Sequence, residues 1–84
     1  MPDFTPQLTK TLRYYFDSQI GKHKMNVQVL MQKGVGVAEH PDIMQTIEDE
    51  LGKIAEYKDK LAALRDVELE DSLSDEAQLS FLSE

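Results

Sequence analysis

Residues 5–32 read TPQLTKTLRYYFDSQIGKHKMNVQVLMQ and predict a long amphipathic helix. Thr5 is a residue type that caps free helix amides, and Pro6 suits the first helical position. Apolar side chains then recur at steps of three and four along one helical face, and His23 completes the series. The apolar members are Leu8, Leu12, Tyr15, Phe16, Ile20, Val27, Leu30 and Met31. We expect the helix to end near Gln32 or Lys33, because Gly34 suits a left-handed helix cap.

A second helix is predicted over residues 41–66. Pro41 again suits the first helical position, and Asp42 places negative charge near the positive end of the helix dipole. The apolar stripe of this segment has heptad-like spacing and is interrupted by Lys58. Its members are Met44, Ile47, Leu51, Ile54 and Leu61, followed by Leu64 or Arg65.

Two helices of similar length and the loop of about eight residues between them predict an all-α fold. We expect an antiparallel two-helix hairpin over residues 1–65, with helices at about 6–32 and 41–66. Pairing across this hairpin places Leu12 beside Leu61. It also places Gly21 and Gly52 at one level, which suggests that the two backbones approach closely there. Two unrelated weak positions, one in each helix, are the alternative explanation.

A single seam between two helices buries only part of this apolar surface. Five further apolar side chains flank the predicted seam: Tyr14, Met25, Val29, Ile43 and Tyr57. Exposed apolar patches of this kind usually mark a binding surface or self-association. We therefore expect the hairpin to bind a partner.

The charge of the chain is concentrated in its last residues. Sixteen acids against nine bases give a formal net charge of −7. Residues 66–84 contain no Lys or Arg but hold Asp66, Glu68, Glu70, Asp71, Asp75, Glu76 and Glu84. We interpret this segment as an acidic tether, and Leu79, Phe81 and Leu82 near its end as the anchors of a short linear motif. A plain solubilising tail and a mimic of DNA are the alternative interpretations.

Several function classes find no support in the sequence. Because the chain has no Cys and only His23 and His40 as histidines, disulfides are excluded and a structural zinc site lacks ligands. The glycines Gly34 and Gly36 follow a predicted helix and lack the Lys-Ser/Thr of a phosphate loop. We therefore expect a non-enzymatic protein without cofactor or metal. We also expect no signal peptide, no membrane span and no sequence-specific nucleic-acid binding.

The segment 78–82 resembles a known class of docking peptide. Gln78, Leu79, Ser80, Phe81 and Leu82 are similar to the peptides by which proteins bind sliding clamps. Placed after an acidic stretch, they resemble the ending of the late-transcription coactivators of T-even-type myophages. Residues 21–27, 39–42 and 54–61 are also similar to segments of small proteins from cyanobacterial myophages of this type.

The resemblance implies a transcription coactivator that acts in the cytoplasm of a bacterial host. The helical hairpin would bind the flap of the host RNA polymerase β subunit, and residues 78–82 would bind the phage sliding clamp. A sigma-like late factor would be a further partner. The apolar residues that flank the seam are the candidates for polymerase binding.

The sequence also departs from that family. Ser80 stands where the family often has Asp, and Ser83 with Glu84 stand where it often continues with an apolar residue. Two other functions stay open. The chain could be a small helical virion or assembly protein that oligomerises through the hairpin, or an acidic inhibitor that mimics DNA.

Overall fold

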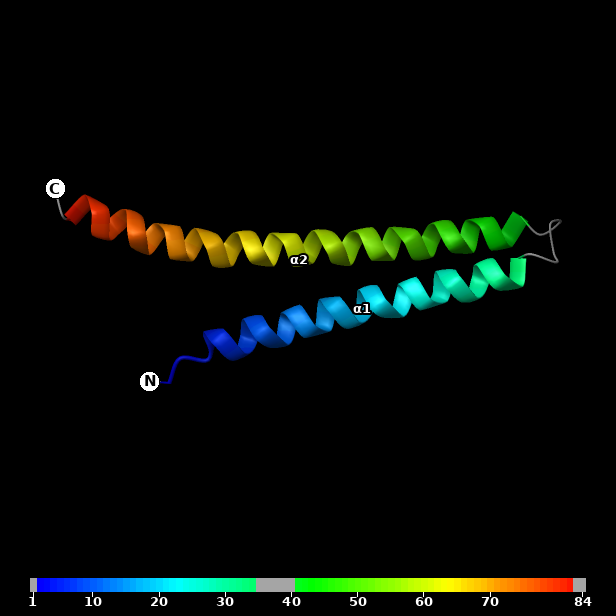
Figure 1. Ribbon diagram of the computed structural model, residues 1–84, viewed down its shortest axis with the longest axis horizontal. Helices are drawn as coiled ribbons and strands as arrows, with labels where there is room; N and C mark the ends of the chain where they lie inside the picture. The colour runs from blue at the N-terminus through cyan, green and yellow to red at the C-terminus, as the bar shows by residue number, and fades with distance from the viewer. Residues whose placement is uncertain (1, 35–40, 83–84) are drawn as a thin grey trace.

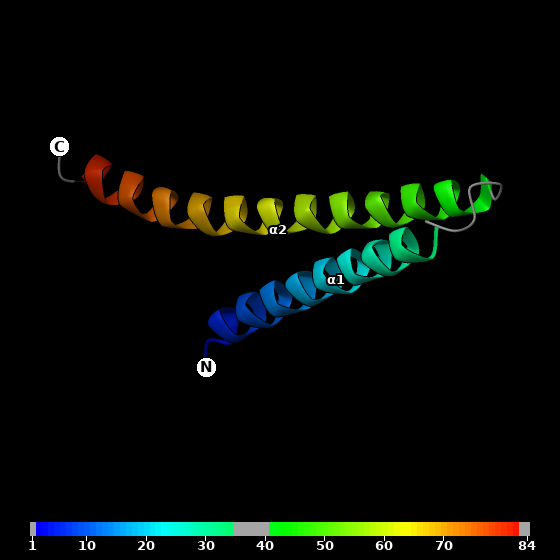
Figure 2. The ribbon, with the colours of Figure 1, turned by 45° about the vertical axis from the view of Figure 1, so that its right-hand side comes forward.

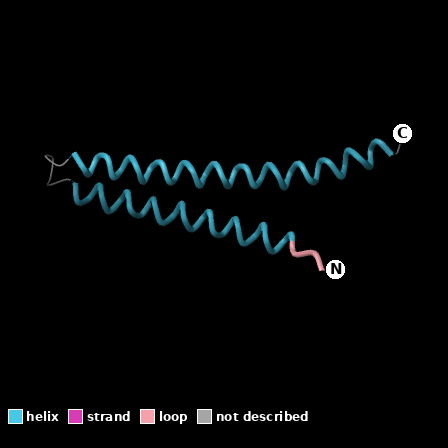
Figure 3. Tube along the Cα trace, turned by 180° about the vertical axis from the view of Figure 1, so that it is seen from behind, coloured by secondary structure: helices cyan, strands magenta, loops and turns pink. Residues whose placement is uncertain are grey.

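The computed structural model describes residues 2–34 and 41–82, and the side chains of residues 2–33 and 42–71. Within these residues the chain forms two α-helices and no strand (Figures 1 and 3). Helix α1 comprises Thr5–Gly34, and helix α2 comprises Pro41–Leu82. The predicted all-helical fold with two packed helices is therefore confirmed for the described residues.

The first turn of α1 is stabilised differently from the sequence prediction. The Thr5 amide donates a hydrogen bond of 3.0 Å to Asp3 Oδ1, and the Leu8 amide donates one of 2.9 Å to the Phe4 carbonyl. Asp3 therefore supplies the capping oxygen that the sequence analysis assigned to Thr5. Hydrogen bonding with Thr5 also lowers the pKa of the Asp3 carboxyl.

Helix α2 is much longer than predicted. It begins at Pro41, as expected, but continues to Leu82 instead of ending near Asp66. Residues 66–82 contain no Pro or Gly, and several of them, notably Glu, Leu and Ala, have high helix propensity. Because backbone hydrogen bonds within a helix need no partner helix, the end of the apolar stripe at Leu64 does not end the helix. The predicted extended tether is a helical arm in this structure.

The two helices lie side by side, and their contacts occur in opposite order along the chain. Arg13 of α1 pairs with Glu68 of α2, whereas His23 pairs with Glu50. The start of α1 and the end of α2 consequently lie at the same end of the molecule (Figure 1). The ribbons are closest near the ends joined by residues 35–40 and diverge toward the start of α1 (Figures 1 and 2).

The core between the helices is small. Its buried apolar side chains are Ile20, Val27, Ile54 and Leu61, all of which belong to the predicted stripes. Phe16, Ile47 and Tyr57 are partly buried against them, and the imidazole of His23 is buried beside them. The core therefore consists of one narrow stripe from each helix.

Several predicted seam residues lie outside this core. Leu8, Leu12, Tyr15, Met31, Met44 and Leu51 are all exposed, and Leu12 keeps 42% of its surface accessible to solvent. Two packed helices cover only a narrow stripe of each other, and the divergence of α1 leaves its first two turns without cover.

The predicted close approach at the glycines is wrong. A Cβ atom built on Gly21 or on Gly52 would meet nothing within 4 Å. Neither glycine has a positive φ angle. The backbones therefore do not require glycine at either position.

Candidate protein-binding surfaces

A polar cluster lies between the two helices beside the apolar core. His23 Nδ1 is hydrogen-bonded to Glu50 Oε2, and the Asn26 side-chain amide donates a hydrogen bond of 3.3 Å to the same oxygen. The His23 ring also stacks on Tyr57, with 6.0 Å between ring centroids. The hydrogen bond with His23 lowers the pKa of Glu50. Because each polar group has a partner, we interpret the cluster as a structural contact that fixes the helix register.

Tyr57 was predicted to flank the seam rather than lie in it, but its side chain belongs to the packing between the helices. Its ring packs against Tyr15 and Phe16, with centroid distances of 6.1 and 6.2 Å, and it lies partly buried against the core. Lys60 Nζ lies 5.0 Å from the centre of the same ring. Tyr57 is therefore part of the packing between the helices.

The other flanking residues divide between two locations. Tyr14, Met25 and Val29 expose 64%, 59% and 42% of their surface, respectively, as predicted for flanking positions. Steps of 11 and 4 residues place all three on the side of α1 opposite the buried core residues, and Val29 also lines a hollow at the edge of the contact between the helices. Ile43 is only partly exposed and lies on α2. The structure thus supports an apolar outer face on α1 but does not join it to Ile43 and Tyr57 in a single patch.

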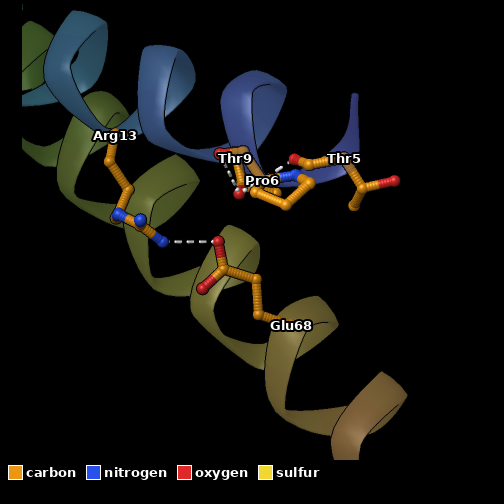
Figure 4. A network of polar contacts seen from close by, with 5 residues as sticks. All are labelled: Thr5, Pro6, Thr9, Arg13 and Glu68. Carbon is orange, nitrogen blue, oxygen red and sulfur yellow. Dashed lines mark hydrogen bonds and ion pairs between the residues drawn. The ribbon is translucent and has the colours of Figure 1, made fainter. Parts of the chain in front are cut away.

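An ion pair fixes the middle of α2 to the first half of α1. Arg13 Nη1 lies 2.6 Å from Glu68 Oε1, and both side chains are partly exposed (Figure 4). In the next turn toward the start of α1, the Thr9 hydroxyl lies 3.1 Å from the carbonyl oxygens of Thr5 and Pro6. Glu68, which the sequence analysis placed in a free tether, is therefore held by α1.

The predicted clamp-binding residues lie in the last turns of α2. The backbone of Gln78, Leu79, Ser80, Phe81 and Leu82 is helical. Their side chains lie outside the described residues, so the proposed anchors stay a prediction.

The structure has an exposed apolar stripe on α2 that is not among the predictions from the sequence. Met44, Leu51 and Leu69 expose 74%, 49% and 57% of their surface, although the first two were assigned to the seam. The sequence signal for this stripe is a heptad spacing of residues on α2 that continues past Lys58.

A shallow hollow lies between the helices and is lined by Asn26, Val29, Leu30, Thr46 and Glu50.

Other site types are not found in the described parts of the chain. No group of three or more His, Asp or Glu side chains there could hold a metal ion. No described helix has the length and apolar composition needed to cross a membrane. No protein-family model, curated protein or solved structure matches the chain.

Proposed function

We propose that this protein is a non-enzymatic coactivator that links a bacterial RNA polymerase to a phage sliding clamp at late promoters. The observation that carries this proposal is the sequence of residues 78–82, with its resemblance to clamp-docking peptides and its place after an acidic stretch. Leu79, Phe81 and Leu82 would insert into a groove of the clamp. The helix pair, as an antiparallel hairpin, would bind the β-subunit flap.

The polymerase contact is assigned to the outer face of α1. Tyr14, Met25 and Val29 lie on this face, and each keeps at least 42% of its surface accessible to solvent. Large apolar and aromatic side chains of this kind are the usual anchors of protein interfaces. Ile43 would extend the contact onto α2. Tyr57 is no longer a candidate, because its ring is used in packing against α1.

The proposed mechanism is tethering. A clamp that encircles DNA restricts the polymerase bound to it to the same duplex, so the local concentration of polymerase at nearby promoters rises without any new contact to bases. The helical arm sets the reach of this tether. Glu68 is fixed to Arg13, and the 14 residues from there to Leu82 rise about 21 Å along a helix. A fully extended segment of the same length would reach about twice as far.

The first experiment compares the full chain with variants of the terminal motif. Phe81→Ala, or a chain ending at Ala77, should lose binding to the purified clamp in calorimetric titrations while keeping binding to the isolated β flap. Ser74→Ala is the matched control on the same arm and should bind the clamp normally. Unchanged clamp affinity in Phe81→Ala would refute the assignment of the motif.

The second experiment tests the helix pair. Val29→Glu or Met25→Glu should weaken capture of the intact protein by the β flap and leave clamp binding unchanged. Leu8→Glu is a matched control, because Leu8 is at least as exposed as Met25 and Val29 but lies near the start of α1. If the unmodified protein fails to bind the flap, the coactivator proposal is wrong.

A small assembly protein is the second candidate. The exposed side chains of Met44, Leu51 and Leu69 favour self-association. Binding assays distinguish the two functions, because an assembly protein would bind neither polymerase nor clamp.

A further inference from the structure

The exposed side of α2 carries a regular pattern over more than three heptads. Residues at steps of four and three form one stripe, which we call the α2 stripe: Met44, Glu48, Leu51, Ala55, Lys58, Ala62, Arg65 and Leu69. All eight side chains are exposed. The core residues Ile54 and Leu61 lie on a different side of the helix, where α1 packs. The α2 stripe is therefore a second, unpartnered helix face with coiled-coil spacing.

The exposed area of the chain is large enough for a substantial interface. A compact monomer of 9.6 kDa exposes about 5,100 Å², whereas this chain exposes 6948 Å². The difference is more than twice the area of about 800 Å² that one partner contributes to an interface of standard size. The surplus arises because the molecule is elongated, with extents of 68 × 27 × 14 Å.

The α2 stripe is complementary to itself in one arrangement. A second copy of α2 can lie antiparallel to the first, with the two-fold axis between the copies level with the point between residues 56 and 57. Leu51 then faces Ala62 of the second copy. Met44 then faces Leu69, and Glu48 faces Arg65. Two-fold symmetry repeats each of these contacts. Apolar side chains meet apolar ones, and acids meet bases.

The charges favour this arrangement over the alternatives. Neither Glu48 nor Arg65 forms an ion pair with another described residue, so both are available to a second copy. A parallel pair in register would instead place Glu48 against Glu48 and Arg65 against Arg65, which is unfavourable. In the antiparallel arrangement Lys58 faces Ala55, and its stem can cover the small side chain while its amine reaches water.

We propose that two copies of this protein associate through the α2 stripe, antiparallel and centred between residues 56 and 57. The dimer leaves the outer face of α1 uncovered and directs the two acidic arms to opposite ends. This separation keeps the seven net negative charges of each copy apart.

Cysteine cross-linking tests the register, and the chain offers a clean background because it contains no Cys. Leu51→Cys protein mixed with Ala62→Cys protein should give a cross-linked heterodimer under mild oxidation. Leu51→Cys alone should not cross-link, because the two copies of position 51 are separated by 11 residues, about 16 Å along the helices. A disulfide needs Cα atoms within about 7 Å. Cross-linking of Leu51→Cys alone, or none in the mixture, would overturn the proposed register.

Charge reversal tests the ion pairs in the full chain. Light scattering should give a mass of twice 9.6 kDa for the unmodified protein. Glu48→Arg alone should weaken dimerisation about tenfold or more, because two ion pairs become two repulsive contacts. The double variant Glu48→Arg with Arg65→Glu should restore dimerisation, since the pairs are swapped rather than lost.

A matched control separates the stripe from general effects of charge. Asp49→Arg makes the same change in charge at the next residue, which lies on a different side of α2, and should leave dimerisation unchanged. Circular dichroism shows whether each variant keeps its helices. A folded protein that is monomeric at high micromolar concentration, or a double variant no better than Glu48→Arg, would refute the proposal.

Discussion

Replacement of Leu61 by alanine should remove a large part of the stability of this protein. Leu61 keeps only 7% of its surface accessible and is one of four buried apolar side chains in the described residues. Leucine-to-alanine changes in protein cores cost about 2–5 kcal/mol. We expect about 2–3 kcal/mol here, because no described side chain is fully enclosed and neighbours at the open edges can move into the space.

The expected loss is large relative to the total. A chain of 84 residues typically has about 4–13 kcal/mol of unfolding free energy, so Leu61→Ala would remove about a quarter to a third of a mid-range value. The corresponding fall in melting temperature is about 10–20 °C. Urea denaturation followed by circular dichroism measures the loss of unfolding free energy, and thermal melts followed by the same signal measure the fall in melting temperature. All variants are compared at one protein concentration.

Leu8→Ala provides the matched control. The chemical change is the same, but Leu8 is 62% exposed on the part of α1 that diverges from α2. We expect a loss of less than about 0.5 kcal/mol for this variant. Equal losses for Leu8→Ala and Leu61→Ala would show that the described core is not the one that stabilises the protein.

Two further predictions follow from the packing and from the polar cluster. Gly21→Ala and Gly52→Ala should each stabilise the protein by up to about 1 kcal/mol, measured in the same urea experiment, because the added Cβ meets no atom within 4 Å. A loss of stability would indicate a close helix approach at that level. Glu50 contributes stability above its ordinary pKa of 4.5, since His23 lowers its pKa in the folded state, and this contribution is lost as the pH falls through the lowered value. Thermal melts between about pH 3 and about pH 7 should therefore show that the melting temperature of Glu50→Gln falls less at acid pH than that of the unmodified protein. Identical pH profiles would contradict the role of Glu50.

The local start signals and the central core could be predicted from the sequence. The start of α2 at Pro41 follows from the fixed φ angle of proline, and Ile20, Val27, Ile54 and Leu61 follow from apolar spacing. The end of α1 was placed within two residues of Gly34. These features depend mainly on residues close together in the chain.

The features that could not be predicted depend on how the two helices pack, which a single sequence does not determine. Leu51 and Tyr57 both lie near the edge of a broad apolar face, and only the position of α1 decides that Tyr57 is packed and Leu51 is exposed. The extension of α2 to Leu82 is not predicted, because the apolar periodicity of the core stripe ends at Leu64. Periodicity reports a partner surface, whereas the helix itself needs only its backbone hydrogen bonds.

The helical arm of α2 gives the end of the chain an orientation as well as a distance. Each residue added within a helix advances its end by about 1.5 Å but turns it by about 100°. Two residues inserted after Asp71 would thus swing the last turn of α2 to nearly the opposite azimuth, while seven would return it close to its original direction. A flexible linker would respond to neither insertion. The direction in which the last turn of α2 faces would then decide whether a partner bound to residues 78–82 can also contact a second partner bound to the helix pair.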